Sequence, residues 1–105
     1  MRPKKIRWIF CEPGERCYKP LCKNENDLEF VILSLDEYET IRLADFVKLY
    51  QTDAAKRMKI SRSTFSRILD SAHYKIADAL INIKAIKIKG GSCKVIGVIK
   101  NEREI

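Results

Sequence analysis

Residues 51–69, QTDAAKRMKISRSTFSRIL, have the spacing of a helix-turn-helix and decide the fold of this chain. Ala55 stands at the fifth position, where two helices cross at a steep angle and a larger side chain would push them apart. Ile60 falls in the turn, where we expect it to be buried. Phe65 and Ile68 are three residues apart, so they share one face of the second helix. The pattern predicts that this face packs inward and that the opposite face meets solvent.

The predicted solvent face of the second helix carries two arginines among short polar side chains, namely Arg62, Ser63, Thr64, Ser66 and Arg67. In DNA-binding helix-turn-helix domains such a face enters the major groove, where a guanidinium can bond guanine or phosphate. Ser61 is expected to cap the helix and to leave backbone N–H groups that suit a phosphate. Further contacts to the DNA backbone are expected from Gln51, Thr52, Lys56 and Lys59. A polar helix face in an ordinary three-helix core is the competing interpretation.

Length and charge indicate one small basic domain. The chain has 105 residues, 46% of them apolar, and a net charge of +7. Residues 24–46 are acidic, and the segments on both sides are basic. There is no apolar run of 18 residues, and the basic start MRPKKIR is not followed by a signal-peptide core, so we expect a cytoplasmic protein without membrane contact. A basic domain of this kind favours a polyanion as partner.

A first helix is predicted from residue 34 to about residues 47–48. Ser34 and Glu37 have the spacing of a capping box. Asp36, Glu37 and Glu39 are interpreted as helix-start acids, which suit the positive N-terminal end of a helix, and not as paired catalytic carboxylates. The helical period gives a buried stripe at Leu35, Tyr38, Ile41 and Ala44, with Leu43 and Phe46 on its flanks.

Two further helices are predicted, and the second of them is long. One spans about residues 51–58; the other begins after Ser61 and keeps a helical period to residue 83. The second half of the long helix must pack on the N-terminal strand, the first helix or a second copy of the chain. The predicted fold class is therefore mainly α, with a tri-helical helix-turn-helix core. The single domain has three parts, which are an N-terminal strand and loop (1–33), the core (34–83) and a β-hairpin (84–100).

The predicted β-elements are short. Alternating apolar side chains in residues 5–10 predict a strand with one buried face, and residues 11–27 are predicted to be loop. Residues 30–33 are either a strand or the approach to the first helix. Two β-rich runs around Gly90-Gly91 predict the hairpin of residues 84–100. Its lysines either contact phosphates as a wing does or are merely solvated.

Neither the cysteines nor the single histidine forms a catalytic or metal-binding motif. Zinc sites usually draw thiolates from close pairs such as C-x2-C, and no pair among Cys11, Cys17, Cys22 and Cys93 is that close. We expect free thiols that are buried or half-buried, and no metal or other cofactor. Metal or thiol sensing stays open as an alternative, because three cysteines lie close together in sequence. His73 lies outside the apolar stripe of its helix and is interpreted as a surface residue, so no enzymatic activity is expected.

Four segments of the chain carry a family resemblance, namely CYKP (17–20), LSLDEYETIRLADF (33–46), LYQTDAAKRMKISRSTFSRIL (49–69) and KIADALINIKAIKIKGG (75–91). Over about residues 4–91 the chain resembles the prokaryotic family of predicted DNA-binding proteins catalogued as domain-of-unknown-function family 134. Its helical part is also similar, over a shorter stretch, to region 4 of sigma factors. The resemblance implies a tri-helical helix-turn-helix core and a role in transcription.

The chain departs from this pattern at two lysines. Members of the family, and helix-turn-helix proteins generally, have glycine in the turns where this chain has Lys48 and Lys59. Glycine is favoured there because the backbone turns left-handed, which costs another residue about 1 kcal/mol. Each lysine adds a cation near the side expected to face DNA.

The leading hypothesis is a sequence-specific reader of double-stranded DNA that regulates transcription and forms a homodimer through surfaces outside residues 51–69. One alternative is a protein-interaction module that docks on RNA polymerase, suggested by the acidic first helix and the sigma-factor resemblance. Another is a metal- or thiol-sensing version of the same DNA reader.

Overall fold

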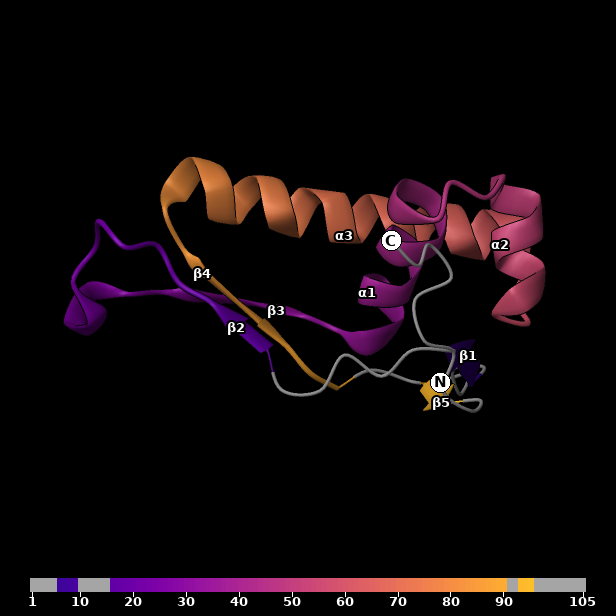
Figure 1. Cartoon of the computed structure of the whole chain (residues 1–105), viewed down its shortest axis with the longest axis horizontal. Helices are drawn as coiled ribbons and strands as arrows, with labels where there is room; N and C mark the ends of the chain where they lie inside the picture. Colours follow the sequence, from indigo (N-terminus) through magenta and orange to yellow (C-terminus); the bar gives the residue numbers. More distant parts are fainter. Residues whose placement is uncertain (1–5, 10–15, 91–92, 96–105) are drawn as a thin grey trace, which may run out of the picture.

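The computed structural model describes residues 6–9, 16–90 and 93–95, and their fold is mainly α-helical (Figure 1). The helical elements are η1 (Glu25–Asp27), α1 (Leu35–Ile41), the π-helical segment η2 (Arg42–Phe46), α2 (Gln51–Arg57) and α3 (Arg62–Asn82). The strands are β1 (Arg7–Ile9), β2 (Arg16–Tyr18), β3 (Phe30–Leu33), β4 (Ala85–Ile88) and β5 (Cys93–Val95). α3 runs along the molecule, with α2 at its N-terminal end and a small sheet beside its other half. The predicted fold class and the long third helix are confirmed.

α1 begins at the predicted capping box. The Ser34 hydroxyl accepts a hydrogen bond from the Glu37 backbone N–H at 3.3 Å, and the Glu37 carboxylate accepts one from the Ser34 N–H at 2.9 Å. The helix continues into η2, which is closed by a bond of 2.8 Å from the Val47 N–H to the carbonyl of Arg42, five residues back. It therefore ends close to the predicted residues 47–48.

The two turns of the helix-turn-helix core contain lysines with left-handed backbones, as predicted. φ is 72° at Lys48 and 60° at Lys59. After α2, the Lys59 N–H bonds the carbonyl of Lys56 and the Ile60 N–H bonds the carbonyl of Ala55, both at 3.1 Å. This pair of bonds is a Schellman motif, which satisfies the last carbonyls of α2 and turns the chain toward α3.

Two clusters of buried side chains hold the helices together. The cluster beneath the helix-turn-helix consists of Leu43, Ala54, Ala55, Met58, Phe65 and Leu69. The cluster between α3 and the sheet consists of Leu33, Ala72 and Ile88. Ala55 is 2% exposed and Phe65 is 0% exposed, which confirms their predicted inward positions.

Several predicted core positions are wrong. Leu43 and Phe46 were placed on the flanks of the first helix, but Leu43 is fully buried and Phe46 is half exposed. Leu43 is buried because it packs into the helix-turn-helix cluster, whereas Leu35 and Tyr38 pack against the cluster between α3 and the sheet. On α3 the inner position belongs to Leu69, and Ile68 is only half-buried. Ile60 is also half-buried and packs against the edge of its cluster.

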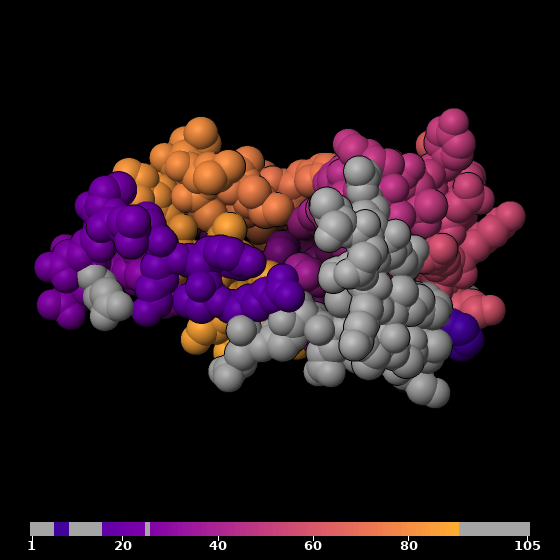
Figure 2. Space-filling model, viewed as in Figure 1, coloured from indigo at the N-terminus to yellow at the C-terminus, as the bar shows by residue number. Residues whose placement is uncertain are grey.

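α3 packs on α1 and on strands β3 and β4, and the sheet lies beside its second half (Figure 1). β3 and β4 were not among the partners predicted for this half. Ala72 and Ala79 face this layer and are buried. On the other side, Leu80 and Ile81 are exposed by 72% and 78%. This part of α3 lies along the upper edge of the surface in Figure 2.

β4 is the central strand of the larger sheet. It pairs antiparallel with β2 and parallel with β3, in the order β2–β4–β3. Residues 30–33 are therefore a strand. The prediction of loop for residues 11–27 is wrong at Arg16–Tyr18, which forms β2 because these residues pair with Ile86–Ile88.

The predicted hairpin of residues 84–100 is also wrong. Both edges of β4 are occupied by β2 and β3, so β4 has no free edge for the run that follows Gly90-Gly91. β5 pairs instead with β1, in parallel and with Trp8 opposite Lys94. The φ of +77° at Gly90 lies in the left-handed region that glycine tolerates, at the point where the chain leaves the larger sheet.

β1 connects the N-terminal segment to the helix-turn-helix turn. The Trp8 N–H donates to the carbonyl of Met58 at 3.1 Å, and the ammonium of Lys59 lies 4.7 Å from the centroid of the Trp8 ring. Trp8 is half-buried, but Ile6 is 61% exposed, so the expected apolar face of this strand is incomplete. Phe10, the third residue of that expected face, lies outside the described residues.

Candidate nucleic-acid interface

The N-terminal end of α3 is capped by Ser61, as predicted. Its hydroxyl accepts a hydrogen bond from the Thr64 backbone N–H at 3.2 Å, and the two hydroxyl oxygens are 3.0 Å apart. Ser63 lies beside the cap, with its hydroxyl 3.2 Å from that of Ser61. The first turn of α3 therefore presents a compact group of hydroxyls with short side chains.

The residues predicted to contact DNA from α3 gather on one edge of this helix, which we call the reading edge. Arg62, Ser63 and Arg67 are exposed, whereas Thr64 and Ser66 are half-buried. Arg67 donates a weak hydrogen bond of 3.3 Å to the Thr64 hydroxyl, which lies one turn before it. Because the buried face of the same turns packs into the core, this edge is held in place by the fold.

The predicted phosphate-contacting residues are less uniform. Thr52 and Lys56 are exposed on α2. Lys59 is exposed too, but its ammonium lies over the ring of Trp8. Gln51 is half-buried, and its Oε1 atom is buried without a hydrogen-bond donor among the described residues. Two of the four side chains are therefore engaged with the protein or directed partly into it.

A polar cavity of about 400 Å³ lies next to the reading edge and was missed by the sequence analysis. Its lining comes from β1, the start of α1 and one stripe of α3, and consists of Arg7, Ser34, Asp36, Glu37, Thr64, Arg67, Ile68, Ser71 and Lys75. Thr64 and Arg67 therefore belong both to the reading edge and to the cavity. The helical spacing of the α3 residues was visible in the sequence, but the approach of β1 and α1 was not.

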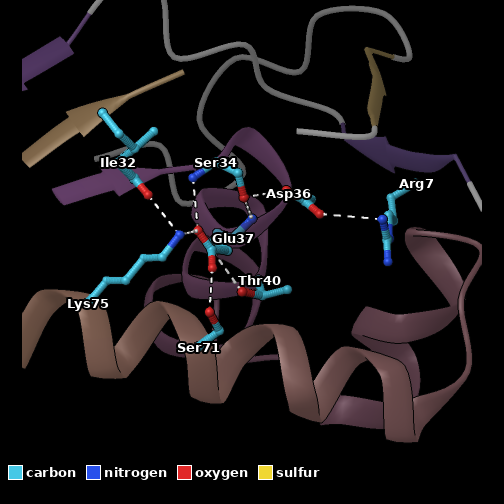
Figure 3. Close-up of polar contacts among 8 residues, drawn as sticks. All are labelled: Arg7, Ile32, Ser34, Asp36, Glu37, Thr40, Ser71 and Lys75. Atoms are coloured by element: carbon cyan, nitrogen blue, oxygen red, sulfur yellow. Dashed lines mark hydrogen bonds and ion pairs between the residues drawn. The ribbon is translucent and has the colours of Figure 1, made fainter. Parts of the chain in front are cut away.

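Glu37 is the centre of the hydrogen bonding in this cavity (Figure 3). Its carboxylate accepts a bond of 2.7 Å from the Lys75 ammonium and one of 2.6 Å from the Ser71 hydroxyl, in addition to the Ser34 N–H. Lys75 also donates to the carbonyl of Ile32 at 2.7 Å. These contacts tie α1, α3 and β3 together.

The contacts of Glu37 lower its pKa. Burial by itself would raise the pKa of this carboxyl, because a buried charge loses its hydration. The hydrogen bonds from Lys75, Ser71 and Ser34 and the positive charge of Lys75 act in the opposite direction and outweigh burial, so the pKa lies below its ordinary value of 4.5. Glu37 is therefore a carboxylate at neutral pH and is paired with Lys75.

The interpretation of the first-helix acids as simple helix-start charges was incomplete. Asp36, Glu37 and Glu39 are all buried, and each has a basic partner. The Oδ2 atom of Asp36 lies 3.7 Å from the Nη1 atom of Arg7. The carboxylate of Glu39 accepts two hydrogen bonds, of 2.8 and 2.9 Å, from the guanidinium of Arg42. The sequence signal for this last pair is its i, i+3 spacing. The acidic character of the first helix is therefore largely withdrawn from the surface.

The histidine and the cysteines lie away from this cavity. His73 is exposed as predicted, and its Nε2 lies 2.7 Å from a carboxylate oxygen of Asp45. Cys17 and Cys22 are exposed free thiols, which corrects the expected burial. Both belong to the segment before β3, which offers little packing to cover them. Cys11 and the side chain of Cys93 lie outside the described residues, so the four-cysteine metal site stays untested.

Within the part of the chain that the structure describes, no helix is long and apolar enough to cross a membrane.

Residues 1–96 match the family described as "Protein of unknown function DUF134". The chain belongs to this family. It is 48% identical to a UPF0251 protein of Prosthecochloris aestuarii over 104 aligned residues, and these make up 99% of this chain and 64% of that relative. It is 50% identical to a UPF0251 protein of Caldanaerobacter subterraneus subsp. tengcongensis over 96 aligned residues, and these make up 91% of this chain and 81% of that relative. No solved structure matches the chain.

The predicted family is thereby confirmed, and the chain spans just under two thirds of the Prosthecochloris relative. The names of these relatives assign no activity. A functional conclusion therefore has to come from the geometry of α2, α3 and the adjoining cavity.

Proposed function

We propose that this protein is a non-enzymatic, cytoplasmic regulator of transcription that binds double-stranded DNA sequence-specifically by placing α3 in the major groove. The observation that supports this most directly is the division of α3 into two faces. Phe65 is 0% exposed and holds one face against the core, while Arg62 and Arg67 are exposed on the other. A fixed helix edge with cations and short hydroxyl side chains can approach base edges closely.

The distribution of charge supports the same function. The chain carries a net charge of +7, and the acidic residues of α1 are buried in ion pairs. Lys56 is exposed on α2 and can contact a phosphate of the DNA backbone. Such contacts position a protein on DNA, whereas base contacts from α3 would supply the specificity.

A random-oligonucleotide selection at two salt concentrations tests the proposal. We expect one sequence family to be enriched at both concentrations. In a plot of the logarithm of its binding constant against the logarithm of the salt concentration, each phosphate contact should contribute a slope of about −0.9. Binding that is equal for selected and random duplexes would reject sequence specificity. Absence of duplex binding at low salt would reject the function altogether.

The rival function, docking on RNA polymerase, rests on an acidic first helix and on the sigma-factor resemblance, and it loses the first of these two supports. A docking surface of that kind needs accessible carboxylates, and those of Asp36, Glu37 and Glu39 are buried and paired. Co-purification of a polymerase subunit with the protein in nuclease-treated extract would revive this rival.

We further propose that the regulator acts as a homodimer. Leu80 and Ile81 are exposed near the C-terminal end of α3, whereas the reading edge is at its N-terminal end. α3 has 21 residues, and at about 1.5 Å per residue the two ends are roughly 30 Å apart. Contact between two copies through these apolar residues would therefore leave both reading edges open to DNA.

A further inference from the structure

The cavity between β1, α1 and α3 contains two arginines whose hydrogen-bonding capacity is largely unused. Arg7 projects from β1 beside Asp36 (Figure 3). Its side chain is only 12% exposed, yet its nearest carboxylate oxygen is 3.7 Å away, which is beyond hydrogen-bonding distance. Its Nε atom is buried without an acceptor among the described residues. Among the described residues, Arg67 on the facing helix donates only the weak bond to Thr64.

Three other side-chain donors of the cavity are already occupied. Ser71 and Lys75 donate to Glu37, and the Ser34 hydroxyl donates to Asp36. The Glu37–Lys75 pair is thus closed, and the cavity lining has three cations against two carboxylates. The uncompensated charge belongs to the guanidiniums.

We infer that this cavity binds a phosphate group between the guanidiniums of Arg7 and Arg67. The largely buried Arg7 guanidinium has Asp36 only at ion-pair distance and no acceptor for its Nε among the described residues, which is costly, and an oxyanion supplies the acceptors that it lacks. A tetrahedral phosphate fits better than a planar carboxylate, because the two arginines approach from different elements and several oxygens can be shared between them. The cavity volume of about 400 Å³ leaves room for such a group with part of the molecule to which it is attached.

The phosphate has two possible sources. One is the backbone of DNA bound by α3, since Arg67 borders both the cavity and the reading edge. The other is a small phosphorylated ligand, which would then compete with DNA for Arg67. The first source rests on the proposed function, whereas phosphate binding by the cavity itself does not.

The first arm of the test measures binding of inorganic phosphate by calorimetry, with chloride at matched ionic strength as reference. We expect binding by the unaltered protein that becomes about tenfold weaker in Arg7→Gln, because one charged fork is lost. Arg16→Gln, the same change on β2 outside the cavity, should bind as the unaltered protein does. Arg7→Lys keeps the positive charge but loses the paired N–H donors of the guanidinium, so its affinity for phosphate should lie between those of Arg7→Gln and the unaltered protein. It is the informative variant if Arg7→Gln does not fold.

The second arm measures the salt dependence of binding to a selected duplex. A slope that decreases by about one in Arg7→Gln identifies a DNA backbone phosphate as the ligand. An unchanged slope together with lost phosphate binding identifies a small phosphorylated ligand. If no duplex can be selected, the proposed DNA function fails while the phosphate arm still decides on the cavity. If neither phosphate binding nor the slope depends on Arg7, the inference is wrong.

Discussion

At the residue scale, a substitution at Arg67 distinguishes contacts to DNA bases from contacts to phosphates. It is exposed on α3, and its only hydrogen bond to the described residues is the weak one to Thr64. We expect Arg67→Ala to weaken binding to a selected duplex by about 1–3 kcal/mol, with little change in the free energy of unfolding. Fluorescence anisotropy on selected and scrambled duplexes measures the effect, with Arg16→Ala as control. An equal loss on both duplexes would show that Arg67 contacts phosphate only.

Glu37 makes stability depend on acid pH. Its folded-state pKa is below the ordinary 4.5, so its ionised form stabilises the fold above that pH, and this contribution disappears as the pH falls through the folded-state pKa. We expect Glu37→Gln to lower the free energy of unfolding by about 1–3 kcal/mol at neutral pH, because the partners of the carboxylate lose their charged acceptor. The variant should also lose less stability than the unaltered protein when acidified below pH 4.5.

Urea unfolding at neutral and acid pH measures both effects. Glu29→Gln removes an exposed carboxyl at the end of the loop before β3 and is the matched control. The same acid-side loss of stability in Glu37→Gln and in the unaltered protein would contradict this role.

At the scale of the elements, the left-handed lysines show how the turns between helices are held. Lys48→Gly should stabilise the protein by about 1 kcal/mol, because glycine adopts a φ of 72° without strain. Lys59→Gly should gain less, because it also removes the ammonium that lies 4.7 Å from the Trp8 ring centroid. Thermal unfolding measures both variants. Lys56→Gly, inside α2, is the control and should destabilise by about 1 kcal/mol. Equal gains at the two turns would mean that the Trp8 contact contributes nothing.

At the scale of the whole molecule, α3 links two tasks at its opposite ends. We expect sedimentation equilibrium to give a mass near twice the 12.2 kDa of the chain, and Leu80→Glu to reduce it, because a charge would replace an apolar side chain that is 72% exposed in one copy. Arg67→Ala should leave the mass unchanged while it weakens DNA binding. A monomer mass for the unaltered protein at every loading concentration would contradict the proposed dimer.

The local structure of the core was predictable from the sequence. The caps at Ser34 and Ser61 and the left-handed turns at Lys48 and Lys59 were all found. At each cap a serine hydroxyl bonds a backbone N–H three residues away, so the pattern of neighbouring residues is sufficient to specify the geometry. The left-handed turns were expected from the glycines that similar proteins have at these two positions. The periodicity of α3 gave the inward position of Phe65 but not that of Leu69, which takes the inner place predicted for Ile68.

The strand partners and the cavity were decided only by the tertiary structure. β4 and β5 look like the two arms of a hairpin, but β2 and β3 occupy both edges of β4, and competition for strand edges cannot be read from either run alone. The cavity brings Arg7, Glu37, Arg67 and Lys75 together from three elements far apart in sequence. Which of these charges are paired depends on burial and on the distances between the elements, and both are set only when the chain packs.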